Sequence, residues 1–257
     1  AEPGFQGAYS GSNPAPASFT LNGTVCTGST GPTDPPPSTD PPGDRVDNPY
    51  AGAKVYVNPE WSANAASEPG GSAVADEPTA VWMDRIAAIE GAGGRMGLRD
   101  HLDEAVDQGA DTFQVVVYNL PGRDCAALAS NGELEPPETD RHREQLIDPS
   151  AEILGDEADA DLRIVAVVEI DSLPNLVTNV GTGDVATETC NEMLENGNYQ
   201  KGIAYALEKL GAIPNVYNYI DIGHHGWLGW DDNFSTSADL ITDVVRQSGS
   251  LGNVAGF

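Results

Sequence analysis

Two carboxylates stand where a buried strand runs into a turn, and their types and spacing suit proton transfer. The apolar run Ile164–Val168 leads into Glu169 and Asp171, and a Ser-Leu-Pro-Asn turn follows. Residues two apart on an extended strand point to the same side, so Glu169 and Asp171 are expected to share one face. Acids at the carboxyl end of a buried parallel strand lie where α/β barrels keep their catalytic groups. The same acids could instead cap the next turn, because Asp and Ser are ordinary turn residues. Spacing alone leaves the two interpretations about equal.

Two other strand ends carry unusual residues. The segment Tyr118–Glu133 reads YNLPGRDCAALASNGE, with a tyrosine at the strand end and an Arg-Asp-Cys run in a glycine-containing loop. The segment Asp221–Trp230 reads DIGHHGWLGW and presents two histidines and two tryptophans. Tryptophan faces stack on the apolar faces of sugar rings, and carboxylates bind hydroxyls, so the combination favours a sugar-binding cleft. In a plainer interpretation, Arg123 and Asp124 form only a local ion pair.

The histidines and tryptophans of Asp221–Trp230 also have plainer roles. Trp227 and Trp230 are three apart and could belong to the core. His224 and His225 lie near Asp221, which suggests zinc. Adjacent histidines rarely converge on one ion and no third ligand is evident, so neither a metal nor a cofactor is predicted.

The elements that must position these residues alternate between strand and helix from residue 46 onward. Strands are predicted at five apolar or β-branched runs: Ala53–Val57, Phe113–Tyr118, Arg163–Ile170, Val216–Ile222 and Asn253–Phe257. Helices are predicted from the apolar spacing of Trp82, Ile86 and Ile89, over His101–Val106, over Arg141–Leu154 with an interruption at Pro149, from Ile203 to Gly211, and from Leu240 to about Gly249. Strand–helix alternation implies a parallel α/β sheet. Five strands cannot close a barrel, so we expect either a small open sheet or, as we favour, a partial (β/α) barrel.

Charge and cysteine content exclude several classes of function. The 257 residues include 40 Asp plus Glu against 12 Lys plus Arg, a net charge of −28, which repels phosphate backbones and anionic lipid. No nucleic-acid or membrane role is therefore predicted, and no stretch approaches the ~20 apolar residues of a membrane span. The three cysteines are an odd number without a CxxC spacing. With a proline-rich linker nearby, this favours a secreted chain.

The amino-terminal residues differ in composition from the rest. Residues 1–27 are rich in Gly, Ser, Asn and Pro, with a short predicted strand at Phe19–Leu21 and an Asn22-Gly23 turn. Their ending, NPAPASFTLNGTVC, resembles the last strands of a family 2 carbohydrate-binding module, whose terminal cysteine pairs with one near the module's start; that start is absent, so Cys26 is the odd cysteine. Residues 28–44 form a Pro/Thr/Ser/Asp linker. Residues 45–257 form the third segment.

Residues 47–257 resemble glycoside hydrolase family 6, the cellobiohydrolases and endoglucanases with a distorted (β/α) barrel. The resemblance rests on NPYAGAKVYVNPEWS, YNLPGRDCAALASNGE, EIDSLPNLVTN, NVYNYIDIGHHGWLGW and NVAGF, which occur in the family's order. It implies hydrolysis of β-1,4-glucan with inversion. The similarity is greater to exocellulases, with cellobiose as the expected product, than to the endoglucanases that remain the alternative.

The resemblance also implies roles for individual residues. Asp171 matches the general acid, and Glu169 is expected to help hold its proton by like-charge repulsion. Asp124 matches the aspartate that tunes this acid and stabilises positive charge on the sugar ring. Tyr118 matches the tyrosine that favours ring distortion, and Ser130 the serine that places the attacking water.

The remaining predicted site residues bind substrate or brace a loop. Trp227 matches a stacking residue on the leaving-group side, and Trp61 is aligned loosely with the opposite side. Cys125 and Cys190 match a family disulfide beside Asp124. The full set expected to contact substrate is Trp227, Trp61, Arg123, Glu169, Asp221, His224 and Trp230.

One component of the inverting mechanism has no counterpart in the sequence. The family's candidate base and further sugar-binding residues lie in a carboxyl-terminal half that the sequence lacks, so the chain is expected to be a fragment. A β-1,4-glucan such as cellulose is the predicted partner, and a monomer the predicted state. A glucan-binding fragment without catalysis, and an unrelated small acidic α/β domain, are the alternatives from other functional classes.

Overall fold

The structure is a computed structural model that describes residues 19–21, 24–26 and 45–257, in two units, 1–38 and 39–257. In the first unit β1 (Phe19–Leu21) pairs antiparallel with β2 (Thr24–Cys26), so the strand predicted at Phe19–Leu21 is confirmed. The predicted Asn22-Gly23 turn and the whole predicted linker, residues 28–44, lie outside the described residues.

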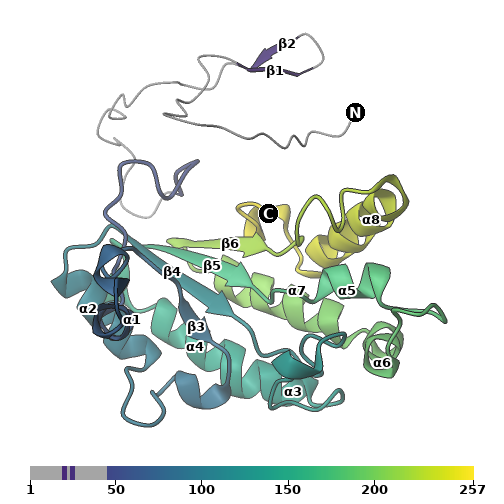
Figure 1. Cartoon of the computed structure of the whole chain (residues 1–257), viewed down its shortest axis with the longest axis horizontal. Coiled ribbons are helices and arrows are strands. Elements are labelled where there is room, and N and C mark those ends of the chain that lie inside the picture. Colours follow the sequence, from purple (N-terminus) through teal and green to yellow (C-terminus); the bar gives the residue numbers. More distant parts are fainter. Residues whose placement is uncertain (1–18, 22–23, 27–44) are drawn as a thin grey trace. The chain divides into compact units, whose positions relative to one another are not determined.

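The second unit is built on a four-stranded parallel sheet (Figure 1). Its strands are adjacent in chain order: β3 (Val81–Met83), β4 (Thr112–Val117), β5 (Arg163–Val168) and β6 (Val216–Ile220). Val117 pairs with Val168, and Val168 with Ile220, so the carboxyl ends of three strands are level. Whatever follows these strands is thereby brought to one edge of the sheet.

Alternation along the strands separates two faces. One face packs into the main core through residues two apart, namely Phe113, Val115, Val117, Ile164, Ala166, Val168, Val216 and Ile220. Helices α2 (Leu98–Asp107), α4 (Asp148–Leu154) and α7 (Asn198–Gly211) contact one another or the strands around this core. The opposite face, with Val165, Val167 and Tyr219, borders a cavity of about 420 Å³. This is the α/β arrangement expected of a partial barrel, with the helices outside.

Five further helices complete the described part of the second unit. They are α1 (Pro59–Ser67), α3 (Thr139–His142), α5 (Leu173–Thr178), α6 (Glu188–Asn196) and α8 (Asp231–Gln247). Short 3₁₀ turns cover Gly71–Ala73, Ile86–Ala88, Leu128–Ser130, Glu157–Asp159 and Leu251–Asn253. In the part of the chain that the structure describes, no helix has the length and apolar character needed to cross a bilayer.

An apolar groove of about 510 Å³ lies between α8 and the segment after β6. Its lining includes Ile222, Leu228, Phe234, Ile241 and Phe257. Phe234 and Phe257 are 65% and 63% exposed, so their rings present apolar surface to solvent.

Three predicted elements are wrong. Trp82 belongs to strand β3 rather than to a helix, because the burial of β3 alternates with period two and Trp82 faces away from buried Val81 and Met83. Around Val55 there is a single bridge to Thr112 instead of the strand Ala53–Val57. At the predicted fifth strand, Asn253–Phe257, only Gly256 pairs with Tyr219. The other predicted strands and helices are confirmed, although α7 begins at Asn198 instead of Ile203 and α8 at Asp231 instead of Leu240.

Pro149 does not break its helix. A π-helical turn, Arg143–Ile147, joins α3 to α4, and Pro149 lies in the first turn of α4. Proline has no N–H to donate to the preceding turn, and a wider turn accommodates both the missing bond and the ring. The chain therefore stays helical from Thr139 to Leu154.

Candidate active site

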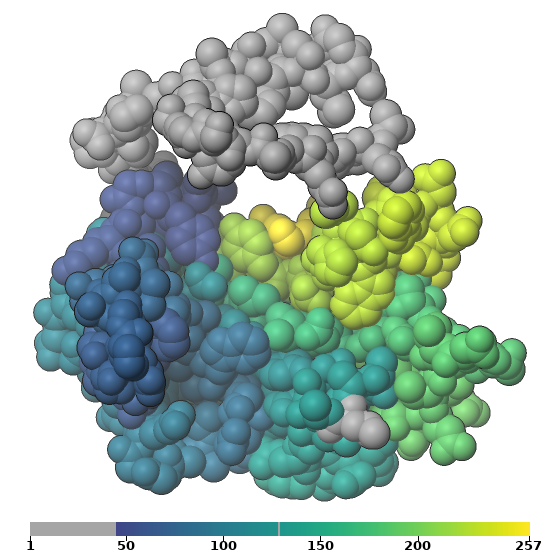
Figure 2. Space-filling view, in the orientation of Figure 1, coloured from purple at the N-terminus to yellow at the C-terminus, as the bar shows by residue number. Residues whose placement is uncertain are grey.

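The predicted site residues follow neighbouring strands at the level edge of the sheet. Tyr118 comes directly after β4, Asp221 directly after β6, and Asp171 three residues after β5. The backbone N–H of Asp171 donates to Asp221 Oδ2 at 2.9 Å, which fixes the turn after β5 to the end of β6. In Figure 2 the strand-bearing middle of the chain lies between the amino-terminal part of the second unit, in purple and blue, and α8, in yellow.

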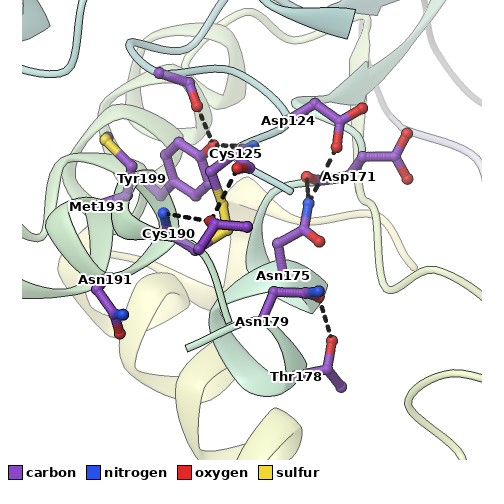
Figure 3. Close-up of a disulfide and its surroundings, with 12 residues drawn as sticks. Asp124, Cys125, Asp171, Asn175, Thr178, Asn179, Cys190, Asn191, Met193 and Tyr199 are labelled. Carbon is purple, nitrogen blue, oxygen red and sulfur yellow. Dashed lines mark hydrogen bonds between the residues drawn. A yellow bond between two sulfur atoms is a disulfide. The ribbon is translucent and has the colours of Figure 1, made fainter. Parts of the chain in front are cut away.

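An asparagine bridges the two acids assigned to catalysis. Asn175, in the first turn of α5, donates through Nδ2 to Asp124 Oδ1 at 3.2 Å and to the carbonyl of Asp171 at 2.6 Å (Figure 3). Asp124 is buried, whereas Asp171 remains half-buried. The sequence analysis did not select Asn175; its position four residues after Asp171, at the start of a helix, was the available signal.

Backbone strain is concentrated at the same place. Asp124, Glu169 and Asp171 have φ of 48°, 53° and 51°, and among the described residues they are the non-glycine residues with positive φ. Left-handed conformations persist where the surroundings hold them, and they cluster at functional sites. The prediction that Glu169 and Asp171 share one face of an extended strand is therefore wrong, because the chain turns at both residues.

The environment of Asp171 favours its protonated form. Burial raises the pKa of the Asp171 carboxyl, and the charges of Asp124 and Asp221 raise it further. The side chain accepts no hydrogen bond from the described residues, so nothing offsets these effects. An aspartic acid that keeps its proton at higher pH than usual is suited to general-acid work.

Tyr118 lies against this pair of acids. Its hydroxyl is 3.4 Å from Asp124 Oδ2, and burial together with the Asp124 charge raises the pKa of Tyr118 to about 12. The Arg123 guanidinium stacks 4.2 Å from the Tyr118 ring centre. The Arg123 charge opposes part of the rise in the Tyr118 pKa, and the Ser130 carbonyl accepts from Arg123 Nε at 2.9 Å in the same loop.

Arg123 organises the loop instead of projecting into solution. Its guanidinium donates to the carbonyls of Tyr118 (2.8 Å), Asp84 (2.7 Å), Ser130 (2.9 Å) and Asn131 (3.2 Å). These four bonds use all three nitrogens of the guanidinium. Arg123 therefore holds the loop in place instead of making the predicted contact with substrate.

The predicted disulfide is confirmed. Cys125 and Cys190 are bonded, which joins the residue after Asp124 to helix α6 (Figure 3). The Tyr199 hydroxyl accepts from the Cys125 N–H at 3.1 Å and donates to the Gly122 carbonyl at 2.5 Å. Thr187 Oγ1 donates to the Cys125 carbonyl at 3.0 Å. The loop that carries Asp124 is thus held on three sides.

The aromatic residues after β6 form the other wall. Trp227 Nε1 donates to Thr178 Oγ1 of α5 at 2.8 Å, so the indole is fixed against the helix that carries Asn175. Trp230 is 54% exposed, which excludes the core role considered for it. His224 is exposed, with its ring 6.2 Å from that of Trp227.

Glu169 does not have the predicted role of helping Asp171 to hold its proton. It is 1% exposed, and its carboxylate accepts the backbone N–H groups of Asn119 (3.0 Å) and Leu120 (3.1 Å) and faces His142 Nε2 at 2.7 Å. The charges that raise the Asp171 pKa are those of Asp124 and Asp221 instead. Glu169 is therefore unavailable to bind substrate.

One aromatic residue at the site was missed. Trp82 of β3 is 48% exposed and meets the Tyr118 ring edge-on, with 5.7 Å between ring centres. The spacing of Trp82, Ile86 and Ile89 fits a helix, which hid the strand that carries Trp82. A strand of three residues is also too short for its alternation to be recognised in the sequence. Trp61, the residue predicted for this side, lies on α1 and is exposed.

Within the described residues, no group of His, Cys, Asp and Glu is arranged to hold a metal ion.

Comparison with known proteins identifies the family of the chain. The profile of "Glycosyl hydrolases family 6" matches residues 46–257, most of the chain. The chain belongs to glycosyl hydrolase family 6. Exoglucanase A of Cellulomonas fimi is 48% identical over 234 residues, which cover 83% of this chain and 26% of the relative. A 1,4-beta-D-glucan cellobiohydrolase of Podospora anserina, CEL6C, is 42% identical over 193 residues, 72% of this chain and 44% of the relative.

Solved structures of family 6 members share the fold. The catalytic domain of C. fimi Cel6B is 46% identical with a TM-score of 0.75, over 83% of this chain and 51% of that one. Cellobiohydrolase II (Cel6A) of Humicola insolens, in complex with glucose and cellotetraose, is 32% identical with a TM-score of 0.68, over 80% and 58% of the two chains. This chain thus spans about half of the family 6 domains that it matches, which accounts for a sheet of four strands that is part of a barrel.

Proposed function

We propose that the chain carries the acid side of a site that hydrolyses β-1,4-glucosidic bonds of cellulose with inversion. The observation that carries the proposal is a half-buried Asp171 whose pKa is raised by burial and by Asp124 and Asp221. A glucosidic oxygen is a poor leaving group, so bond cleavage needs an acid that is still protonated at the working pH.

Three further residues have roles at the reacting sugar. Asp124, buried beside the Asn175 amide, stabilises positive charge on the ring and tunes Asp171. Tyr118, stacked between Arg123 and Trp82, presses on the sugar and favours its distortion. Ser130, whose carbonyl accepts from Arg123 Nε in the same loop, positions the attacking water.

Aromatic rings bind the glucan on both sides of these residues. Trp227 stacks on the leaving-group side, and its bond to Thr178 fixes the ring plane. Exposed Trp230 and His224 extend that side. Trp82 replaces Trp61 as the nearest aromatic residue on the opposite side, and Trp61 remains a more distant candidate.

The relatives support finer proposals. Those compared are named exoglucanase or cellobiohydrolase, which favours exo action with cellobiose as product over endo action. The name of the P. anserina relative also favours a β-1,4-glucan such as cellulose as the substrate. A secreted, monomeric chain remains a proposal from the sequence. The proposed segments stay as predicted: residues 1–27 as the end of a cellulose-binding module, 28–44 as linker and 45–257 as the catalytic part. No residue is assigned as the base.

Sugar release from amorphous cellulose tests the proposal. Two proteins are compared: this chain, and a chimaera in which the part of C. fimi Cel6B that the chain does not match follows Phe257. We expect little release from the chain and clear release from the chimaera. Asp171→Asn should reduce release by the chimaera on the order of 10²–10⁴-fold, because general-acid catalysis contributes about that much. Near-unchanged release would overturn the assignment of Asp171.

A second candidate function is glucan binding without hydrolysis, favoured by the half-length match and by the exposed indoles. Affinity electrophoresis in a soluble β-1,4-glucan separates the two. Retardation without sugar release by both proteins would favour binding.

A further inference from the structure

A buried histidine–glutamate pair lies behind the proposed acid. His142, the last residue of α3, is fully buried, and its Nε2 is 2.7 Å from Glu169 Oε1. The other oxygen of Glu169 accepts the N–H groups of Asn119 and Leu120. One carboxylate thus joins α3, the end of β4 and the end of β5.

The pair holds the turn that leads to Asp171. Glu169 has φ of 53° and Asp171 of 51°, and the Glu169 carbonyl accepts from Ser172 Oγ at 2.5 Å. A left-handed residue without glycine's freedom needs such support from its surroundings. The side chain of Glu169 anchors the first of these strained residues, and the second is the proposed acid.

The hydrogen-bond partners fit one arrangement of the proton between the two side chains. Glu169 Oε2 accepts from two backbone N–H groups, and an ionised carboxylate accepts at both oxygens. With Glu169 ionised, His142 Nε2 carries the hydrogen that Oε1 accepts. His142 Nδ1 is buried and has no partner among the described residues. A neutral imidazole leaves only an acceptor unfilled there, whereas a charged one would leave a buried donor unpaired.

The local structure orients the His142 imidazole toward Glu169. The π-helical turn after His142 adds a residue to the helical path, so that His142, Leu146 and Ile147 are all buried ahead of Pro149. On the other side the ring packs on α7 at Gly202, where an added Cβ would lie 3.4 Å from His142 Cε1. Little space is left for another orientation of the imidazole.

We propose that His142 is a positioning residue for Asp171, acting through Glu169. Its Nε2–H bond holds the Glu169 carboxylate, which keeps the turn after β5 in the conformation that places Asp171 beside Asp124 and Asp221. The proposal rests on the proposed role of Asp171 as general acid. Tyr199 of α7 is also titratable: burial raises its pKa, and the charges of Asp124 and Glu169 raise it further.

The test measures the pKa of Asp171 in the intact chain by carbon-13 NMR of its carboxyl. In His142→Leu the bond to Glu169 is lost, and the Asp171 pKa should fall toward the ordinary value of an aspartate. His142→Gln retains a donor for Oε1 and should keep the raised value. The matched control is His101→Leu, which removes another buried histidine, bonded to the Tyr56 hydroxyl through Nδ1 at 2.8 Å, and should leave the Asp171 pKa raised.

Two results with the variants would overturn the proposal: a raised Asp171 pKa that persists in folded His142→Leu, or an equal fall in His101→Leu, which would indicate general loosening. Nitrogen-15 NMR of the wild-type imidazole does not depend on a variant that folds. It should find the proton on Nε2 and none on Nδ1, and the opposite tautomer would equally refute the proposal. Neither measurement requires turnover, so a chimaera without hydrolytic activity would count against the proposed function and not against this pair.

Discussion

Removal of the Cys125–Cys190 disulfide should lower the free energy of unfolding by about 4 kcal/mol. The two cysteines are 65 residues apart, and the chain-entropy relation for a closed loop of that length gives about 4 kcal/mol at 25 °C. Both cysteines are buried, so replacement by alanine adds a small loss of packing. The perturbation is the double variant Cys125→Ala/Cys190→Ala, made together with Cys26→Ala to prevent exchange with the third thiol.

Urea unfolding followed by tryptophan fluorescence and circular dichroism measures the effect, with Cys26→Ala alone as the reference. The unfolded chain without its cross-link is more expanded, so the dependence of the free energy on urea should also become steeper. A loss below about 1 kcal/mol would refute the reasoning. A large loss with an unchanged urea dependence would place the effect in native packing around Asp124 instead of in the unfolded state.

Three other substitutions test the site without relying on turnover. Because the pKa of Asp171 is raised on folding, the native state binds a proton that the unfolded state releases, and stability falls as pH rises through that interval. Asp171→Asn should therefore unfold at higher temperature than wild type at pH 7, with the gain absent in acid; a lower melting temperature at pH 7 would contradict this. Arg123→Lys should cost about 2 kcal/mol in urea unfolding, because one ammonium cannot reach the four carbonyls that the guanidinium binds; an unchanged midpoint would refute it. Gly223 has φ of 64°, and an added Cβ would lie 2.9 Å from Trp227 Cε3, so Gly223→Ala should displace the indole and weaken cello-oligosaccharide binding. An unchanged affinity in titration calorimetry would show that Trp227 does not contribute to sugar binding.

Long apolar runs made most of the sheet predictable. β4, β5 and β6 are buried β-branched segments whose type could be inferred from composition alone, and the level ends of these strands bring their following residues together. Short elements could not be inferred, because three residues at β3 fit both a strand and the spacing of a helix. The result was a wrong role for Trp82.

The local backbone conformation of the site also could not be predicted from the sequence. Glu169 and Asp171 were expected to point the same way, but left-handed turns at both residues send one carboxylate into the core and leave the other at the surface. That geometry depends on partners distant in sequence, His142 among them, and spacing within one strand cannot reveal it. The disulfide and the Asp124 loop came from family resemblance, which preserves such distant pairings.

The groove beside α8 has a consequence for the behaviour of the chain in solution. Exposed Phe234 and Phe257 offer an adhesive apolar surface to any second copy, while a net charge of −28 drives copies apart. That repulsion vanishes as carboxylates become protonated near the isoelectric point of about 4.1. Light scattering should therefore rise steeply as pH approaches that value, and colloidal stability would depend more on the acidity of the medium than on the strength of the fold.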